Sequence, residues 1–281
     1  MLKHLIPVLL LTLFIACMSK GPQRVEVEVP KTSEPVAHEV HYIANEGVLI
    51  KTPAGNILID AIHDLYDQKY MYTPESVMDD IMAANYPFEN IDAIMITHVH
   101  SDHFDAQLIG QYLQRHPVGL LAAQQVCDSV RKHWPSATFL EQLIEIEQDQ
   151  EITDFSFKDI KVKAIKLEHS AASFNGWVQN FGYHIELGGR TYIHLGDAEI
   201  TPKNLDNIEA AAGNAVDMAI LPFWWLYTNG QNWMKARFFP GAIIGVHVKV
   251  PDSHQFEEAL EAQFPNLEIF NESMEKVIIK E

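Results

Sequence analysis

One short segment of the chain is dense in metal-binding side chains. Residues 98–103 read HVHSDH, and the candidate ligands are His98, His100, Asp102 and His103. Because alternate residues of an extended segment point the same way, His98 and His100 can share one metal ion. The turn that follows brings Asp102 and His103 to the other side, where they can bind a second ion. This spacing indicates a metal centre, whereas the alternative is a solvated polar loop at the end of a strand.

The elements that must hold these ligands can be traced along the chain. Residues 91–97 form a nearly continuous apolar run, which is typical of a strand buried on both faces. Similar strand patterns occur at residues 40–44, 47–51, 56–60, 118–122, 153–157, 160–167, 183–187, 191–195, 218–221 and 242–246. Helical patterns occur at residues 74–85, 108–113, 123–133 and 256–263. Strands and helices alternate in both halves, which predicts two sheets packed between helical layers, in one domain over residues 38–281.

The N-terminal sequence, MLKHLIPVLLLTLFIAC, predicts export. Its apolar run at residues 5–16 falls short of the roughly 20 residues that span a bilayer and fits a secretory signal. The end of the run resembles a bacterial lipoprotein signal, with a small residue before Cys17, although Phe14 stands where that signal usually has leucine. We therefore expect a lipid on Cys17 that anchors the protein to a bacterial membrane, facing the periplasm or the cell exterior. The alternative is a plain signal peptide; residues 18–37 predict a linker.

The composition narrows the function classes. The chain has 281 residues, with 38 acidic and 20 basic side chains and a formal net charge of −18. This charge argues against nucleic-acid binding, because phosphates need a basic face. Two cysteines can form neither a disulfide framework nor a four-cysteine zinc site. The 14 histidines are more than a core needs, which favours a site built from imidazole and carboxylate.

The HVHSDH motif after a buried strand resembles the metallo-β-lactamase superfamily of binuclear metal hydrolases. That superfamily places its next ligands at the ends of later strands, and LEHS at 167–170, HLGD at 194–197 and IGVH at 244–247 match in order. The resemblance implies an α+β fold, a four-layer αβ/βα sandwich of two mixed sheets flanked by helices. It also implies two divalent metal ions, with zinc favoured and manganese or iron as alternatives. One ion would bind His98, His100 and His169, and the other would bind Asp102, His103 and His247, with Asp197 bridging.

Further residues take roles through this resemblance. Asp60 ends an apolar run and resembles a carboxylate that orients a ligand imidazole; alternatively it is a turn or cap residue. Asn45 stands where many members have histidine, and we expect it near the substrate. Trp224 and Trp225 occupy the position of a Pro-Ile-Gly-Gly loop and are expected to face an apolar or ring-containing substrate, unless they belong to the core. His63, in a loop after Asp60, is a further candidate for substrate contact.

These features predict an exported metal-dependent hydrolase that resembles the short bacterial lactonases and phosphodiesterases of the superfamily. A hydroxide bridging the two ions would cleave an ester, lactone, amide or phosphodiester bond of a small molecule, with Asp102 orienting the nucleophile and accepting its proton. Two alternatives stay open: a non-catalytic metal-binding lipoprotein of the same fold, and a single-iron sulfur dioxygenase. No nucleic-acid partner is expected, and membrane contact is expected only through the N-terminal lipid.

Overall fold

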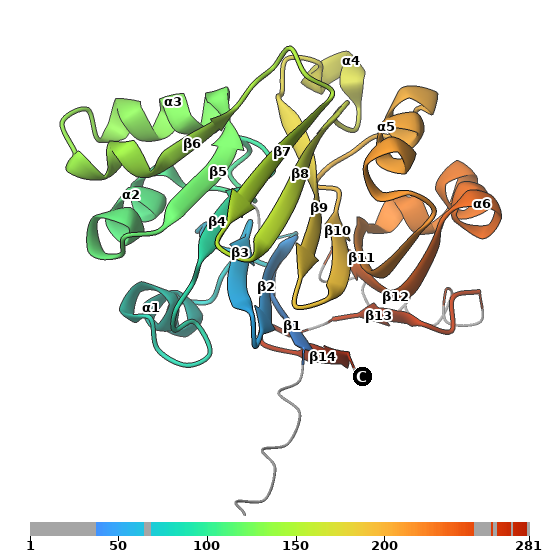
Figure 1. Cartoon of the computed structure of the whole chain (residues 1–281), viewed down its shortest axis with the longest axis horizontal. Coiled ribbons are helices and arrows are strands. Elements are labelled where there is room, and N and C mark those ends of the chain that lie inside the picture. Colours follow the sequence, from blue (N-terminus) through green and yellow to red (C-terminus); the bar gives the residue numbers. More distant parts are fainter. Residues whose placement is uncertain (1–37, 65–68, 250–259, 261–262, 271, 280–281) are drawn as a thin grey trace, which may run out of the picture. The chain divides into compact units, whose positions relative to one another are not determined.

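The computed structural model describes residues 38–64, 69–249, 260, 263–270 and 272–279, which belong to one compact unit, Val36–Glu281 (Figure 1). The predicted signal peptide with Cys17, the predicted linker at 18–37 and most of the helix predicted at 256–263 lie outside the described residues. Within the described part of the chain, no helix is both long and apolar enough to cross a membrane.

The strands of the described residues form two seven-stranded sheets. The first has the order β14-β1-β2-β3-β4-β5-β6, with β1 (His38–Ala44), β2 (Gly47–Thr52), β3 (Gly55–Ile59), β4 (Ala93–Ile96), β5 (Gly119–Ala123), β6 (Leu143–Ile146) and β14 (Lys276–Ile279). The second has the order β13-β12-β11-β10-β9-β8-β7, with β7 (Ile152–Phe157), β8 (Ile160–Leu167), β9 (Asn180–Leu187), β10 (Arg190–His194), β11 (Ala215–Pro222), β12 (Phe239–Val246) and β13 (Leu267–Ile269). Both sheets are mixed, because each contains parallel and antiparallel pairs.

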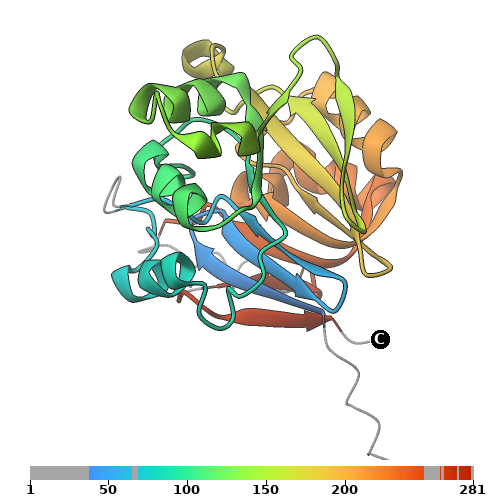
Figure 2. The same ribbon diagram turned by 60° about the vertical axis from the view of Figure 1, so that its left-hand side comes forward.

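Helices cover the outer face of each sheet (Figure 2). The helices are α1 (Glu75–Ala83), α2 (Ala106–Arg115), α3 (Gln124–His133), α4 (Ala172–Asn175), α5 (Pro202–Ala212) and α6 (Thr228–Arg237), with 3-10 turns at Thr138–Gln142 and Phe223–Leu226. Apolar side chains of α1, α2 and α3 pack on the first sheet, and those of α5 and α6 pack on the second. A further apolar cluster fills the space between the sheets. The predicted four-layer αβ/βα sandwich is therefore confirmed.

Several helices and short strands were not indicated by the sequence patterns: α4, α5, α6, β6, β13 and β14. Strands β13 and β14 have only 3 and 4 residues, so alternation of apolar side chains cannot reveal them. Helix α5 does carry a start signal, because Thr201 caps its N-terminus through Asn204 N and Pro202 occupies its first turn.

The direction of the strands brings their carboxyl ends to common edges. Strands β3, β4 and β5 are parallel in the first sheet, as are β10, β11 and β12 in the second. Strand β8 points the same way as β10, because each pairs antiparallel with β9. The segments that follow β4, β8, β10 and β12 carry all seven predicted metal ligands, so the topology places each ligand at a carboxyl end.

Candidate metal centre

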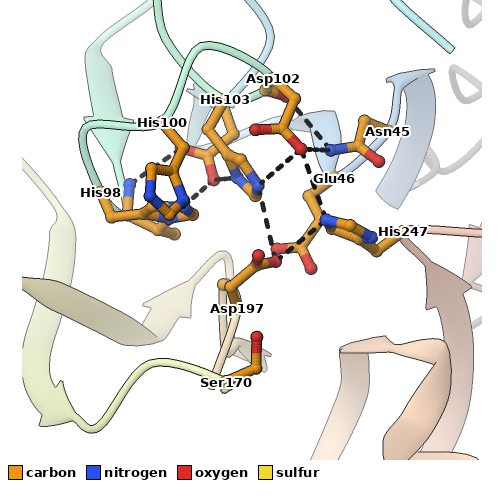
Figure 3. A network of polar contacts seen from close by, with 12 residues as sticks. Asn45, Glu46, His98, His100, Asp102, His103, Ser170, Asp197 and His247 are labelled. Carbon is orange, nitrogen blue, oxygen red and sulfur yellow. Dashed lines mark hydrogen bonds and ion pairs between the residues drawn. The ribbon is translucent and has the colours of Figure 1, made fainter. Parts of the chain in front are cut away.

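The seven predicted ligands come together at the carboxyl ends of four strands. Figure 3 labels six of them, all except His169. His98, His100, Asp102 and His103 follow β4, while His169, Asp197 and His247 follow β8, β10 and β12. Backbone hydrogen bonds join these segments: Ser170 N donates to Asp197 O at 2.6 Å, and His247 N donates to Asn45 O at 3.2 Å. The ligands are therefore held by backbone contacts that cross from one strand end to another.

Three imidazoles form the first group. Nε2 of His98 lies 3.0 Å from Nδ1 of His100, and Nε2 of His169 lies 3.2 Å from each of these two atoms. The ligand atoms of these histidines and of Asp197 all lie within 4.8 Å of one another. Burial lowers the pKa of His98, His100 and His169 below the ordinary histidine value. They are therefore neutral near pH 7, which is the form that binds metal ions.

The second group consists of Asp102, His103 and His247, whose ligand atoms also lie within 4.8 Å of one another. Nε2 of His247 lies 3.4 Å from Oδ2 of Asp102 and 3.3 Å from Oδ1 of Asp197. Nε2 of His103 lies 3.5 Å from the same Oδ1, whereas the other oxygen of Asp197, Oδ2, lies 3.5 Å from Nε2 of His169. Asp197 therefore presents one carboxylate oxygen to each group, as a bridging ligand requires.

Opposite charges within the second group shift the pKa values of its members. Burial alone would lower the pKa of His103, but the carboxylates of Asp102 and Asp197 raise it well above the usual range. Burial would also lower the pKa of His247, but Asp197 and Asp102 raise it to about 10. The two imidazoles in turn hold the pKa values of Asp102 and Asp197 below that of an ordinary aspartate, although burial opposes this. A divalent cation bound here would take the place of the imidazole protons.

The residues present fit two divalent ions. Nε2 of His103 and Oδ1 of Asp197 are buried and have no hydrogen-bond partner among the described residues. Buried polar atoms are almost always paired, so the two atoms indicate a ligand between them. Imidazole and carboxylate are the donors that zinc, manganese and iron use in proteins. One ion would be held by His98, His100 and His169. The other would be held by Asp102, His103 and His247, and Asp197 would bind both ions.

Asp60 lies where the family resemblance implies a carboxylate that orients a ligand. Its Oδ2 lies 2.8 Å from Nδ1 of His103, on the ring edge opposite the metal-facing nitrogen. Its two oxygens also accept hydrogen bonds from Oγ1 and N of Thr97, at 2.5 and 2.8 Å. Asp60 and His103 are both fully buried. This contact fixes which nitrogen of His103 carries the proton.

Asn45 is placed differently from its predicted role at the substrate. It is fully buried, and its Nδ2 lies 3.2 Å from both O and Oδ2 of Asp102, to which it donates. Asn45 therefore positions a metal ligand and does not line an open substrate surface. The reason is the tight turn between β1 and β2, which points this side chain at the loop after β4.

Glu46, the next residue along the chain, was missed in the sequence analysis. It is fully buried, and its carboxylate lies within a group of possible ligand atoms with His103 and Asp197, all within 4.8 Å of one another (Figure 3). Burial and the charge of Asp197 raise the pKa of Glu46 well above the usual range. A signal was present, since Glu46 is a lone acidic residue within the apolar stretch 42–50, where a charge is unexpected.

The two predicted substrate tryptophans have different environments. Trp224 is half-buried, and its ring centroid lies 5.2 Å from that of His247. Trp225 is fully buried in the core, which is the alternative that the sequence left open, and its ring has no exposed face for a substrate. Both indoles donate a hydrogen bond to Ala198 O, at 3.0 and 2.9 Å. Tyr70 lies on His247 as well, with a centroid distance of 4.6 Å.

His63 is fully buried, so the predicted contact with substrate is not available to its ring in this structure. Burial lowers the pKa of His63 to about 4, and the ring is neutral near pH 7. Ala61 and Ile62, which precede His63, are buried in the core as well, so the segment after β3 enters the interior and does not run along the rim.

A pocket of about 310 Å³ opens beside the first group, at residues other than His169 for which the sequence patterns predict no role. His169, Asn175 and Trp177 line it, together with Lys166 and Lys203. The Trp177 ring is 60% exposed and lies 6.0 Å from that of His100, between centroids. Phe174 of α4 is 82% exposed nearby. The signal was the SFNGW sequence at 173–177, in which two aromatic residues flank a turn shortly after a ligand.

The chain is similar to known proteins in sequence and in fold. A UPF0173 protein of Pyrococcus abyssi is 30% identical over 169 residues, which cover 56% of this chain and 60% of that protein. This chain therefore matches less than two thirds of that relative's length. Among solved structures, a possible metal-dependent hydrolase from Veillonella parvula has a TM-score of 0.61 and 15% identity, over 86% of this chain and 100% of that one.

A further solved structure, the metallo hydrolase Igni18 from Ignicoccus hospitalis, has a TM-score of 0.59 and 17% identity, over 87% of this chain and 99% of that one. The two structures are named a possible metal-dependent hydrolase and a metallo hydrolase, and at these identities they show a shared fold alone. The profile of the beta-lactamase superfamily domain matches residues 55–262, a range that contains all seven candidate ligands. Because this match spans well over half of the chain, the protein belongs to the beta-lactamase superfamily domain family.

Proposed function

We propose that this protein is an exported hydrolase that uses two divalent metal ions to cleave an ester, lactone, amide or phosphodiester bond of a small molecule. The observation that carries the proposal is the position of Asp197, which presents one oxygen to the three-histidine group and the other to His103 and His247. A carboxylate placed between two ligand groups supports a pair of ions acting together. Isolated ion sites would not need it.

When bound, the two ions would lower the pKa of a water molecule and polarise an oxygen of the substrate. The chain supplies the groups that orient and accept the proton. Asp102 is ionised at neutral pH, because neighbouring imidazoles hold its pKa below the usual range although burial opposes this. Its carboxylate can therefore accept a hydrogen bond, and then a proton, from an attacking water. Asn45 keeps Asp102 in place through contacts to both its backbone and its side chain.

The surroundings of the centre favour a substrate with an apolar or ring-containing part. Trp177 and Phe174 are exposed on one side, beside the pocket at His169. Trp224 lies on the other side against His247. Aromatic faces of this kind bind flat or apolar groups, while the metal-facing donors bind the polar group that reacts. Zinc suits the imidazole-rich first group, and manganese or iron are alternatives for the centre.

The N-terminal sequence supports export and lipid attachment at Cys17. Replacement of Cys17 by Ser in the full chain tests this part of the proposal. We expect the wild-type chain in the membrane fraction of a bacterial host, and the variant in the soluble fraction or uncleaved. Equal distribution of the two chains would contradict lipid anchoring and leave the plain signal peptide as the explanation.

Activity is tested with metal-loaded protein on a panel of lactones, aryl esters, amides, phosphodiesters and a chromogenic cephalosporin. The matched pair of variants is His98→Ala, within the first group, and His133→Ala, an exposed histidine at the end of α3. We expect hydrolysis of at least one class, lost in His98→Ala and kept in His133→Ala. Hydrolysis that survives His98→Ala would show that the activity does not come from this centre.

A further inference from the structure

Glu46 is held rigidly beside the second group. The turn between β1 and β2 is fixed by His194, whose Nε2 lies 2.9 Å from Glu46 O, and by the hydrogen bond from His247 N to Asn45 O. Gly47 lets the turn pack closely, since a Cβ there would lie 2.8 Å from Asp60 O and 2.9 Å from the Ala61 Cα. The backbone on both sides of Glu46 is therefore locked against the strand ends that carry the ligands.

The carboxylate of Glu46 has no partner for either oxygen among the described residues, and both oxygens are buried. A carboxylate in such a place is costly unless it is hydrogen-bonded, paired or bound to a metal ion. Oδ1 of Asp197 and Nε2 of His103 share this condition, and these are the atoms that face the second group. One cation between Glu46, His103 and Asp197 would satisfy all three side chains, whose ligand atoms lie within 4.8 Å of one another (Figure 3).

We propose that Glu46 is an additional ligand of the ion held by Asp102, His103 and His247. The two sites then differ in chemistry. The first has three imidazoles and one oxygen of Asp197, which suits zinc in four-coordinate geometry. The second has two imidazoles and the carboxylates of Asp102, Asp197 and Glu46. Five donors rich in oxygen favour an ion of higher coordination number, such as Mn²⁺ or Fe²⁺.

This inference rests on the two-ion centre of the proposed function, and its test separates the two. The full chain is stripped of metal with a chelator, and Mn²⁺ and Zn²⁺ are titrated into the wild type, Glu46→Gln and Glu46→Asp. Glu186→Gln, a change at an exposed glutamate of β9, is the control. We expect two ions per wild-type and control chain. In Glu46→Gln we expect Mn²⁺ affinity to fall by about 10-fold or more at one site, with zinc binding at the other unchanged.

Thermal unfolding distinguishes a ligand from a structural residue. Glu46→Gln replaces a buried carboxyl group without a hydrogen-bond partner by an amide of the same size, so the melting temperature of the metal-free variant should be unchanged or higher. The increase on adding Mn²⁺ should be smaller than in the wild type. Glu46→Asp keeps the charge and should show part of the wild-type increase. Wild-type binding of two ions with the same Mn²⁺ affinity and the same increase in Glu46→Gln would overturn the role of Glu46 alone. A wild type that binds no ion would overturn the two-ion centre and this inference with it.

Discussion

Nδ1 of His103 lies 2.8 Å from Oδ2 of Asp60, and neither side chain is exposed to solvent. When a metal ion replaces the proton on Nε2, the neutral ring would donate its Nδ1 proton to Asp60, and Nε2 faces Asp197, 3.5 Å away. Because Thr97 holds the same carboxylate through its N–H and hydroxyl groups, Asp60 cannot turn away from the ring. A carboxylate outside the metal centre thus sets the orientation of a ligand inside it.

Replacement of Asp60 by Asn should weaken metal binding without removing a ligand. The amide keeps the size of the carboxylate but accepts a weaker hydrogen bond from His103. We expect an affinity lower by about 10- to 100-fold at the second site, measured by competition with a chromogenic chelator. Asp217→Asn is the control, since Asp217 accepts hydrogen bonds from Arg190 and Thr191 instead of a ligand. Equal affinity in wild type and Asp60→Asn would contradict the orienting role.

Replacement of Trp177 by Ala should affect substrate binding more than chemistry. The indole lies at the pocket beside His169 but offers no metal ligand. We expect KM for ring-containing substrates to rise by about 2- to 10-fold, as for the loss of one aromatic contact, with kcat and metal content close to wild type. Tyr86→Ala, at an aromatic residue that is 71% exposed beside Lys51, is the matched control. A fall in kcat with unchanged KM would argue against the binding role.

Gly196 allows Asp197 to reach the centre. Its φ is +54°, and an added Cβ would lie 2.7 Å from the Thr97 Cβ and 2.8 Å from the Asn180 Oδ1. We expect Gly196→Ala to destabilise the fold by about 2–4 kcal/mol in denaturant unfolding and to reduce metal content, because Asp197 must shift. Gly189→Ala separates the cost of the backbone conformation from the cost of the clash, because the φ of Gly189 is +79° and an added Cβ would have nothing within 4 Å. We expect a destabilisation of only about 1 kcal/mol and full metal content. Equal effects of the two changes would refute the steric argument.

The neutral, buried His63 predicts a pH dependence of stability. Its pKa is about 4 in the folded protein, because of burial, and about 6.5 when unfolded. The unfolded chain therefore binds more protons as pH falls below 6.5, and stability is lost until pH reaches about 4. Between pH 7.5 and pH 5 we expect the metal-free wild type to lose about 2 kcal/mol more than His63→Gln, from urea unfolding. The same loss in both proteins would show that His63 is not the group responsible.

Much of the centre could be predicted because its ligands follow strands in a fixed order. His98, His100, Asp102 and His103 are contiguous, so their pattern is visible without any knowledge of the fold. Asp197, after a strand and a glycine, needed the family resemblance, because a single aspartate at a strand end has no pattern of its own. The ligands meet because the strands that precede them run in the same direction within each sheet. The spacing of residues in the sequence does not reveal these strand directions.

The residues that the sequence analysis missed or misplaced act through burial and packing. Glu46 contacts the ligand group only because the turn after β1 lies against the end of β10. Tryptophan and histidine often bind substrates when they are exposed, but Trp225 and His63 are both fully buried in the fold. Which of two adjacent tryptophans faces the centre depends on the 3-10 turn at Phe223–Leu226, and four residues of turn carry too little periodicity to predict that choice.

The central claim is that Asp102, Asp197 and five histidines hold two divalent ions in one centre. Native mass spectrometry of the metal-free chain after addition of zinc or manganese tests it most directly, with His98→Ala and His133→Ala measured alongside. We predict two ions on the wild type and on His133→Ala, and fewer on His98→Ala. A wild type that retains no ion and gains no hydrolytic activity with either metal would contradict the claim.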